Sequence, residues 1–383
     1  MTSLPQPSAE QLTHSAAVTG AIRAQIAASG GWLDFSRYME MALYAPGLGY
    51  YSAGMQKFGS GGDFVTAPEI SALFGRTLAR QVAQIIRASD GEVLELGAGT
   101  GRFAVQLLTE LQRLDALPGR YLILEVSAHL RAVQQETIQR ELPDALASRV
   151  QWLDALPDVF AGCVVGNEVL DALPVHLVAQ RENGISERGV GVEGEALVWR
   201  ERPVEGALAD AVRMRKLPND YITEICLAAP ALIASLAERL ERGALLLIDY
   251  GFPRREYYHP QRGAGTLMCH YRHHAHDDPF LFPGLQDITA HVDFTAIAEA
   301  GVAHGLQVLG YTSQAQFLIN SGITDLLSQI SPSDVAAYLP LAAEAQKLLS
   351  PAEMGELFKV IALGKGLGQP LLGFSGGDKR HAL

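Results

Sequence analysis

Three polar residues follow a short apolar run in the stretch GNEVLDALP, from Gly166 to Pro174. The run, residues 163–165, has the composition of a buried strand, and Asn167, Glu168 and Asp171 come where it ends. Carboxylates at that place could orient a donor-rich nucleophile and accept the proton that it releases. If the nucleophile is a guanidinium, two carboxylates offer paired acceptors for its planar fork. The alternative is that the two acids cap a following helix, since acids are favourable at helix N-termini.

A glycine-rich turn, ELGAGTG, supplies a second candidate site. Gly97, Gly99 and Gly101 let backbone amides approach a ligand closely, and a helix N-terminus after the turn favours negative charge. A dinucleotide-binding dehydrogenase would need a glycine where this chain has Arg102. The form E-x-G-x-G-x-G, with Glu95 before the turn, instead resembles motif I of class I S-adenosylmethionine (AdoMet) methyltransferases. The alternative is a purely structural turn.

Acids end the next two predicted strands as well. Glu125 lies in the range where dinucleotide-type folds place an acid that accepts both ribose hydroxyls. Asp154 lies where such methyltransferases often keep an acid or amide that reads the adenine amino group. Either acid alone could be a solvated strand end, but three acids at consecutive strand ends favour a ligand site. Asp249, at the end of the fifth strand, is either a pocket acid or a core carboxylate.

The elements that position these residues alternate between short apolar strands and helical segments. This βαβ order predicts a parallel, doubly wound sheet with both faces covered. The five predicted strands are EVLELGAG, YLILEVS, VQWLDA, GCVVGNE and GALLLIDYG.

Two domains are expected along the chain. Residues 1–88 read as an N-terminal cap, helical and then rich in Gly and Tyr, and residues 89–383 as the sheet domain. Insertions follow strands four and five, at about residues 176–216 and 252–294. The first resembles a β-hairpin, and the second an ordered substrate loop.

Longer motifs carry a more specific resemblance. They are GDFVTAPEISALFG, VLELGAGTG, GNEVLDALP, LLLIDYG and GTLMCHYRHHAHDDPFLFPGLQDITAHVDF. Together, in this order, they resemble the MidA-like family of AdoMet-dependent methyltransferases. That family is related to the mitochondrial complex I assembly factor that methylates protein arginine. The resemblance covers nearly the whole chain, from about Gly20 to Gly364.

The resemblance implies a Rossmann-like class I methyltransferase sheet, AdoMet as cofactor, and roles for the residues above. The glycine turn would cradle the cofactor with Glu95 near its amino-acid end, Glu125 would hold the ribose, and Asp154 the adenine. A segment on the N-terminal side would close over the cofactor through Gly62, Asp63, Phe64 and Thr66.

On the substrate side, the resemblance implies that Asn167, Glu168 and Asp171 face the methyl acceptor. His291 and Asp293 are expected to line the same pocket, the alternative being a helix start capped by Thr289 or Asp293. The expected activity is methylation of a protein arginine, with a respiratory complex I subunit as one candidate substrate. Two alternatives stay open: methylation of a small molecule or RNA, and a non-catalytic assembly factor that binds AdoMet.

Composition limits the partners. The net charge of −12 argues against a phosphate-tracking nucleic-acid surface and against attraction to an anionic membrane. Three widely spaced cysteines, the absence of a recognisable leader and the lack of a long apolar span favour a cytoplasmic protein.

The histidines between His270 and His276 are not expected to bind metal, because flanking Pro and Gly make a helix doubtful there. The hairpin insertion, with apolar residues such as Trp199, could form a homodimer surface or cover the protein's own core.

Overall fold

The structure, a computed structural model, describes residues 4–53, 65–215 and 217–383. The chain divides into two compact units. Unit 1 consists of the described residues within Met1–Phe64, Leu170–Ala231 and Arg254–His291. Unit 2 consists of the described residues within Val65–Val169, Leu232–Pro253 and Val292–Leu383. The sequence placed the first boundary after residue 88. The structure differs because the helix over residues 72–89 is amphipathic and buries its apolar face in the core of unit 2.

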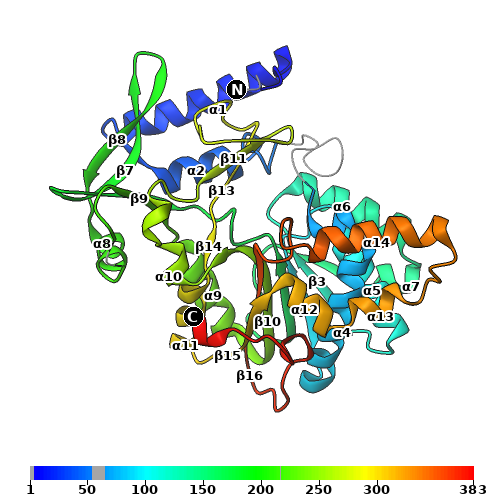
Figure 1. Cartoon of the computed structure of the whole chain (residues 1–383). Helices are drawn as coiled ribbons and strands as arrows, with labels where there is room; N and C mark the ends of the chain where they lie inside the picture. The colour runs from blue at the N-terminus through cyan, green and yellow to red at the C-terminus, as the bar shows by residue number, and fades with distance from the viewer. Residues whose placement is uncertain (1–3, 54–64, 216) are drawn as a thin grey trace. The chain divides into compact units, whose positions relative to one another are not determined.

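Unit 2 contains an eight-stranded sheet and the helices that cover it (Figure 1). Its strands are β2 (Glu92–Leu96), β3 (Tyr121–Leu124), β4 (Val150–Leu153), β5 (Phe160–Asn167), β10 (Leu240–Phe252), β14 (Val292–Asp293), β15 (Gln307–Ser313) and β16 (Phe358–Lys365). Its helices are α3 (Ala67–Ile70), α4 (Ala72–Ser89), α5 (Arg102–Arg113), α6 (Ala128–Glu141), α7 (Asp144–Ala147), α11 (Phe294–Ala303), α12 (Gln314–Asn320), α13 (Ile323–Leu327) and α14 (Val335–Leu349), with 3-10 turns at Leu372–Phe374 and Arg380–Ala382.

The strand order of this sheet is β15-β16-β10-β5-β2-β3-β4, with the short β14 beside β10. The five strands predicted from the sequence are β2, β3, β4, β5 and β10, and their pairings with one another are all parallel. The sheet is nevertheless mixed, because β16 runs antiparallel to both of its neighbours. The carboxyl ends of the five parallel strands therefore lie along one edge.

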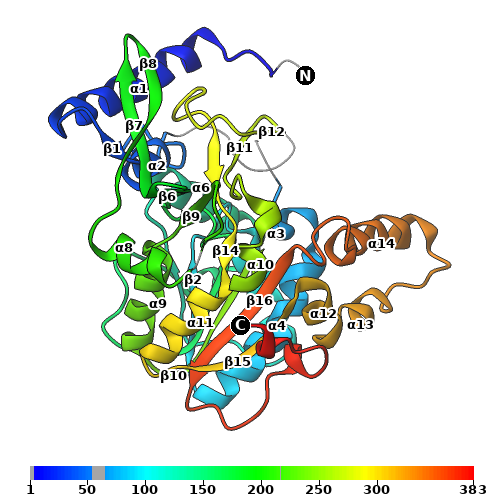
Figure 2. The ribbon, with the colours of Figure 1, turned by 60° about the vertical axis from the view of Figure 1, so that its left-hand side comes forward.

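Alternate residues of the strands face opposite helical layers. Val93 and Val165 belong to one core cluster with the apolar faces of α4 and α5, including Leu78 and Leu107. On the other face, α11 packs closely, since a Cβ on its Gly301 would meet the side chain of a β16 residue, Leu363, at 2.9 Å. Figure 2 shows α11 on one side of β10 and β16, and α4 and α12 on the other. Both faces of the central strands are thus covered, as their continuous apolar runs predict.

Unit 1 combines the N-terminal helices with two small sheets. Its elements are α1 (Ala9–Ala28), β1 (Leu33–Asp34), α2 (Phe35–Tyr44), β6 (His176–Arg181), β7 (Gly184–Glu193), β8 (Ala196–Pro203), α8 (Gly206–Arg213), β9 (Tyr221–Ile225), α10 (Arg254–Tyr257), a 3-10 turn at Pro260–Arg262, β11 (Met268–Tyr271), β12 (His274–His276) and β13 (Asp287–Thr289). Helix α9 (Ala228–Arg239) begins in unit 1 and ends in unit 2.

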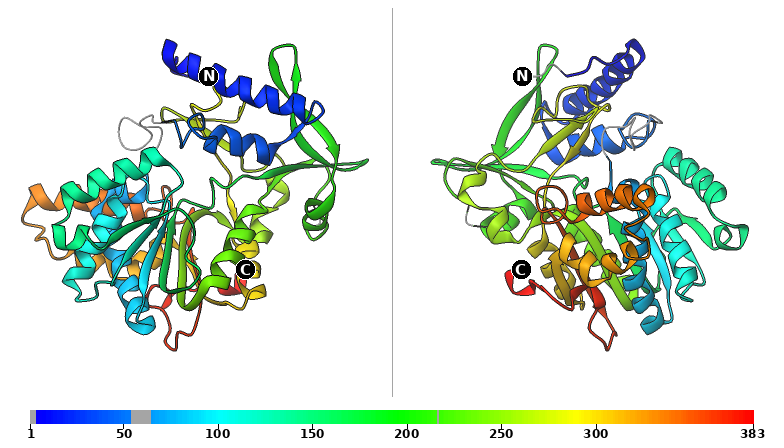
Figure 3. Two further views of the ribbon diagram at one scale, coloured as in Figure 1. Left: turned by 180° about the vertical axis from the view of Figure 1, so that it is seen from behind. Right: turned by 45° about the vertical axis from the view of Figure 1, so that its right-hand side comes forward.

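The long strand β7 organises unit 1. It pairs antiparallel with β1, β6 and β8, and β9 adds to β6. The predicted hairpin insertion therefore forms a sheet, whose β7–β8 hairpin lies beside one end of α1 in Figure 3. Arg23 of α1 donates a hydrogen bond to the carbonyl of Gly194 in the hairpin turn, at 3.1 Å. The late insertion, expected as a loop, contains the three-stranded sheet β12-β11-β13.

Candidate functional site

Most of the predicted site residues of unit 2 lie at the carboxyl edge of its sheet. Strands β2, β3, β4 and β5 are parallel neighbours, so the residues that follow them emerge at the same edge. Ligands bind at this edge in open α/β sheets.

The glycine turn has a backbone that requires its glycines. Gly97, Gly99 and Gly101 have φ values of +59°, +53° and +86°, a region that side chains other than glycine rarely adopt. Gly101 is also the N-cap of α5, and as a glycine it has no side chain with which to cap that helix. The first amides of α5 are therefore available to a ligand, as at other anion-binding helix N-termini.

Helix α3 is fastened to this turn through a residue that the sequence analysis did not select. Glu69 accepts a hydrogen bond from the hydroxyl of Thr100 and forms an ion pair with Arg102 at 3.3 Å. The signal was present in the sequence, since Glu69 belongs to the quoted motif GDFVTAPEIS. Thr66 is the N-cap residue of α3, and its side chain makes no capping hydrogen bond. Gly62, Asp63 and Phe64 lie outside the described residues.

Glu125 directly follows β3, and its carboxylate is held by hydrogen bonds from neighbouring residues. Its Oε1 accepts the backbone N–H of Ser127 at 2.8 Å, and its Oε2 accepts the side-chain amide of Gln134 at 2.8 Å. The residue is 7% exposed. Burial raises the pKa of Glu125 above its ordinary value, and the bonds from Ser127 and Gln134 oppose that shift. The backbone N–H of Val126 also donates to the Glu125 carboxylate and likewise lowers its pKa.

Gln134 of α6 connects the parts of this edge. Besides Glu125, its amide nitrogen donates to the carbonyl of Gly99 at 3.1 Å, and its oxygen accepts the indole N–H of Trp152 at 2.9 Å. The residue is completely buried. The sequence did carry a signal, because Gln134 lies at helical spacing between the buried Leu130 and Ile138, where an apolar residue is expected.

Two neighbours of Glu125 are more accessible. The side chain of Asp154, after β4, is 90% exposed and forms an ion pair of 2.7 Å with Arg131. Arg131 also donates to the carbonyl of Leu153 at 2.9 Å, which fixes it against the end of β4. Val126, which directly follows Glu125, is 78% exposed.

Glu95 has a different environment from the other acids. It is 2% exposed, and its carboxyl group accepts the hydroxyl of Tyr121 at 2.7 Å. Burial raises the pKa of Glu95 to about 8, an effect that the Tyr121 hydrogen bond partly opposes. Its role near the amino-acid end of AdoMet stays a prediction, and the structure assigns it a protein partner.

Asn167 and Glu168 end β5 as expected. The side-chain amide of Asn167 donates to Glu168 Oε1 at 2.9 Å, and the backbone N–H of Glu168 donates to the carbonyl of Ile248 at 2.9 Å. Glu168 has a φ of +54°, an uncommon conformation for a residue with a side chain. No helix follows within the described residues 168–175, so the alternative in which Glu168 and Asp171 cap one does not apply.

Asp171 belongs to unit 1, although only two residues separate it from Glu168. It is 5% exposed, and its carbonyl accepts the N–H of Ala290 at 3.0 Å. Within unit 1 its charge contributes, after that of Asp287, to the raised pKa of Tyr51, for which burial is the largest cause. The hydroxyl of Tyr51 donates to Asp287 at 2.9 Å. Tyr51 and Asp287 were not selected from the sequence, because only the fold brings them near Asp171.

His291 and Asp293 are divided in the same way. His291 belongs to unit 1, where its N–H donates to the hydroxyl of Thr266 at 3.1 Å. Asp293 belongs to unit 2, pairs with Phe252 beside the end of β10, and caps α11 by accepting the N–H of Ala296 at 3.1 Å. The capping alternative therefore describes Asp293, and its contact with substrate stays a prediction.

The histidines from His270 to His276 lie on the β11–β12 hairpin, not on a helix. His274 is bonded through Nδ1 to the carbonyl of Arg272 at 2.7 Å, and burial lowers the pKa of His276. These histidines form no metal-binding group in the part of the chain that the structure describes.

Every helix among the described residues of the chain is too short or too polar to cross a membrane.

Solved structures similar to this chain come from Burkholderia thailandensis. One, bound to S-adenosyl-homocysteine, is 55% identical and has a TM-score of 0.96, with complete coverage of both chains. A second, described as a native crystal structure, is 54% identical and has a TM-score of 0.94, with the same coverage. The mixed sheet is therefore that of a class I methyltransferase, and the predicted fold class is confirmed.

Curated relatives are named protein arginine methyltransferase NDUFAF7, mitochondrial. The protein from Danio rerio is 30% identical over 87% of this chain and 83% of its own, and that from Mus musculus 29% over 88% and 81%. The Drosophila melanogaster homolog is 27% identical over 97% and 91%. These names are consistent with a protein substrate. They contradict the expected cytoplasmic location, which rested on cysteine usage and on the N-terminal residues, neither of which reports a compartment reliably.

The family assignment rests on most of the sheet. The family model described as "Putative S-adenosyl-L-methionine-dependent methyltransferase" matches residues 77–312, which include the glycine turn, Glu125 and the end of β5. The chain thus belongs to this family and is an enzyme that uses S-adenosylmethionine as its methyl donor.

Proposed function

We propose that this methyltransferase transfers the methyl group of AdoMet to an arginine side chain of a protein. The observation that carries the proposal is Glu168, a carboxylate fixed at the end of β5 by strand pairing and by Asn167. The names of the relatives support the same substrate class.

The residues at the carboxyl edge fit AdoMet. Gly101 has no side chain to cap the amides at the start of α5, and Glu125, linked to the turn through Gln134, is the carboxylate that we assign to the ribose hydroxyls. Val126 offers an exposed apolar surface for a base, and Asp154 an exposed acceptor for an amino group. We assign the cofactor to these residues together with Gly97, Gly99 and Gly101.

Bound AdoMet supplies a methyl group on a positively charged sulfur, which a nitrogen lone pair can attack. In our proposal Glu168 binds the guanidinium through charge-assisted hydrogen bonds and turns one nitrogen toward the methyl carbon. The new N–C bond forms as the S–C bond breaks, and the nitrogen then loses a proton. Glu168 is the group that we assign to receive that proton.

The conformation of Glu168 supports this role. A non-glycine residue in the left-handed region costs on the order of 1 kcal/mol, and such strain is found preferentially at functional sites. The strand pairing to Ile248 holds the strained residue in place. A carboxylate held in this way needs little rearrangement when substrate arrives.

We include Asp171, His291 and Asp293 among the residues proposed to act on the substrate side, with Asn167 as the residue that orients Glu168. Asp293 contributes least in this proposal, since it already caps α11.

Methyl transfer to a small molecule or RNA is the second candidate function, and the net negative charge of the chain makes RNA the less favoured of these two substrates.

Transfer of a labelled methyl group separates the candidate functions. The enzyme is incubated with AdoMet labelled in the methyl group and a lysate of the source cells, which is then divided into protein, nucleic acid and small-molecule fractions. We expect label in protein. Label confined to another fraction would refute the proposal, as would the absence of transfer under conditions where AdoMet binds.

A subunit of respiratory complex I is the first defined protein substrate to test, because the relatives' name includes NDUFAF7. Recombinant subunits with arginine-containing segments would be assayed one at a time.

A further inference from the structure

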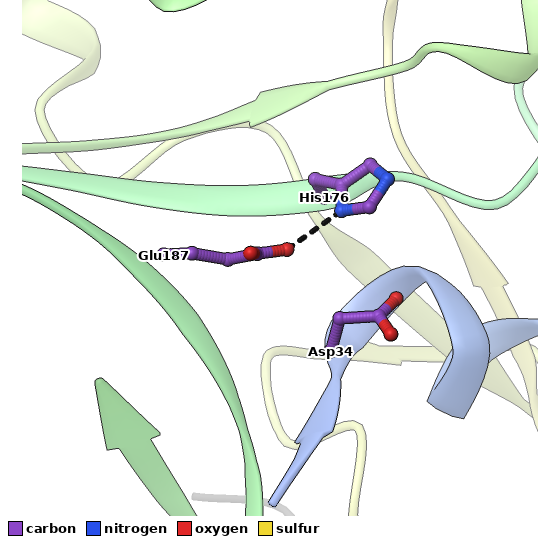
Figure 4. Close-up of side chains that lie close together, drawn as sticks. All are labelled: Asp34, His176 and Glu187. Carbon is purple, nitrogen blue, oxygen red and sulfur yellow. Dashed lines mark hydrogen bonds and ion pairs between the residues drawn. The ribbon is translucent and has the colours of Figure 1, made fainter. Parts of the chain in front are cut away.

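The side chains of Asp34, His176 and Glu187 lie close together in unit 1 (Figure 4). The proposed methyl transfer does not use them. One possible metal-ligand atom from each lies within 4.8 Å of the others. His176 Nδ1 is 2.7 Å from a carboxylate oxygen of Glu187. Among the described residues, no other group of three His, Cys, Asp or Glu side chains meets this criterion.

The register of the sheet explains why these residues meet. On β7, Glu187 and Gly189 point to the same face, because side chains alternate along a strand. Asp34 pairs with Gly189, so its side chain is on that face too. Glu187 pairs with Val178, and His176 lies two residues before Val178 on the same strand. The neighbouring strands β6 and β7, and β1 from far earlier in the chain, therefore each direct one ligand-type side chain to one place.

The three residues are held by regular structure and are partly shielded from water. The side chains of His176 and Glu187 are 22% and 14% exposed. Asp34 is the N-cap of α2, where its Oδ1 accepts the N–H of Arg37 at 2.8 Å and leaves Oδ2 for another partner. At Gly189, a Cβ would be 2.3 Å from the carbonyl oxygen of Leu33, so the glycine allows β1 to approach β7 closely.

The nearby cations are engaged elsewhere. The guanidinium of Arg37 forms an ion pair with Glu40 at 2.5 Å. Arg202 lies opposite Glu187 on β8, but its guanidinium is over the ring of Trp32 at 4.8 Å and donates to the carbonyl of Gly30 at 3.3 Å. On the part of the chain described, the imidazole of His176 is the one basic group paired with either carboxylate.

Two carboxylates that converge on one imidazole repel each other unless a positive charge lies between them. We infer that Asp34, His176 and Glu187 form a binding site for a divalent transition-metal ion of the Zn²⁺ class. One imidazole nitrogen and two carboxylate oxygens match the ligand preferences of Zn²⁺ and similar ions. Ca²⁺ and Mg²⁺ prefer all-oxygen sites with more ligands. Water completes the coordination of the ion.

The ion takes the place of the hydrogen bond between His176 and Glu187, and its ligands need only small side-chain rotations to reach it. Metal–ligand bonds of about 2.0–2.2 Å bring the three ligand atoms nearer to one another than the 4.8 Å limit. The bound ion joins β1, β6 and β7 and thereby stabilises unit 1.

Titration of the chelator-treated protein tests this inference directly. Calorimetry with Zn²⁺ should give one site per chain, and Co²⁺ should produce the visible absorption of a protein-bound ion. Zn²⁺ in large excess over the dissociation constant should raise the melting temperature by about 2 °C or more. Mg²⁺ and Ca²⁺ at the same concentration should leave it unchanged.

Two pairs of variants assign the ligands. Glu187→Gln and His176→Gln should each weaken Zn²⁺ binding by at least about tenfold. Glu193→Gln, an exposed carboxylate on the same strand as Glu187, and His304→Gln, an exposed histidine that directly follows α11, should bind like the wild type. Circular dichroism before metal addition shows whether each variant is folded.

Absence of stoichiometric Zn²⁺ binding would overturn the inference. So would wild-type affinity in folded Glu187→Gln or His176→Gln, which would mean that the three residues form only an ion-pair cluster. Neither result bears on the proposed methyl transfer, because none of these residues belongs to the assigned cofactor or substrate site.

Discussion

Glu168 combines a negative charge with a strained backbone at the end of a buried strand. Changing it to Gln keeps the size and one acceptor but removes the charge that would hold a guanidinium. Loss of one charge-assisted contact in a desolvated site should cost about 2–4 kcal/mol of transition-state stabilisation, a roughly 30- to 1,000-fold fall in turnover. Affinity for S-adenosylhomocysteine and the melting temperature should change little.

The matched control for this variant is Glu136→Gln, whose side chain is 78% exposed on α6. It should keep wild-type turnover. Near-normal turnover in Glu168→Gln would remove that residue from the catalytic site, and a large fall in melting temperature would point to a structural role instead.

The glycines of the turn are a second test at this scale. Gly99 has a φ of +53°, so a valine there is strained and also places a branched side chain where the ligand must lie. We expect Gly99→Val to abolish measurable binding of S-adenosylhomocysteine in calorimetry. Gly119→Ala is the control, because a Cβ at Gly119 meets no atom within 4 Å and its φ lies outside the left-handed region. Retained tight binding by Gly99→Val would contradict the assignment of the cofactor to this turn.

At the scale of elements, α6 positions the cofactor edge through Gln134, which bonds both Glu125 and the Gly99 carbonyl. Gln134→Ala leaves buried acceptors unpaired, at a cost of about 1–3 kcal/mol. We expect affinity for S-adenosylhomocysteine to fall by about 5- to 150-fold. The exposed neighbour Gln135→Ala should behave like the wild type.

A purely structural role for Gln134 predicts a different pattern. The melting temperature of Gln134→Ala would then fall while the affinity of the folded fraction stayed at the wild-type value. Turnover measured at saturating AdoMet adds a further distinction, because a positioning residue should affect the apparent affinity for AdoMet more than the maximal rate.

The elements that sequence alone could predict are those whose signals are local. The glycine turn, Glu125 and Glu168 each follow an apolar strand directly, and the parallel order places their strand ends at one edge. Strand β16 also has a local apolar run, FKVIALG, but its antiparallel place in the sheet depends on pairings with residues far away in the chain.

The parts that sequence could not predict depend on long-range contacts. Glu168 and Asp171 look like one constellation in the sequence, yet they belong to different compact units. Glu69 bonds Thr100 and Gln134 bonds Gly99, which lie 31 and 35 residues away in the chain. Asp34 and Glu187 meet only because β1 and β7 pair, which no local pattern reports.

At the scale of the whole molecule, the buried Glu95 makes stability depend on pH. Its pKa is about 8 in the folded protein and near its ordinary value of about 4.3 in the unfolded chain. Between these values the folded protein keeps a proton that the unfolded chain has lost. Rising pH therefore favours unfolding, with a contribution on the order of 1 kcal/mol per pH unit that ends above pH 8.

Glu95→Gln removes this contribution, since Gln does not titrate. The free energy of unfolding of the variant relative to the wild type should rise from pH 5 to pH 8, as measured by urea denaturation at several pH values. A difference that does not change with pH would show that Glu95 ionises in the folded protein near its ordinary pKa.

The central claim for the molecule is that it methylates arginine in a protein. The most direct measurement is the identity of the amino acid that carries the methyl group after reaction with labelled AdoMet. Labelled protein is hydrolysed to amino acids, which are separated and compared with methylated standards. We predict that the label elutes as methylarginine and that Glu168→Gln reduces it by at least about 30-fold. Label in methyllysine, in a methyl ester or in no amino acid at all would contradict the claim.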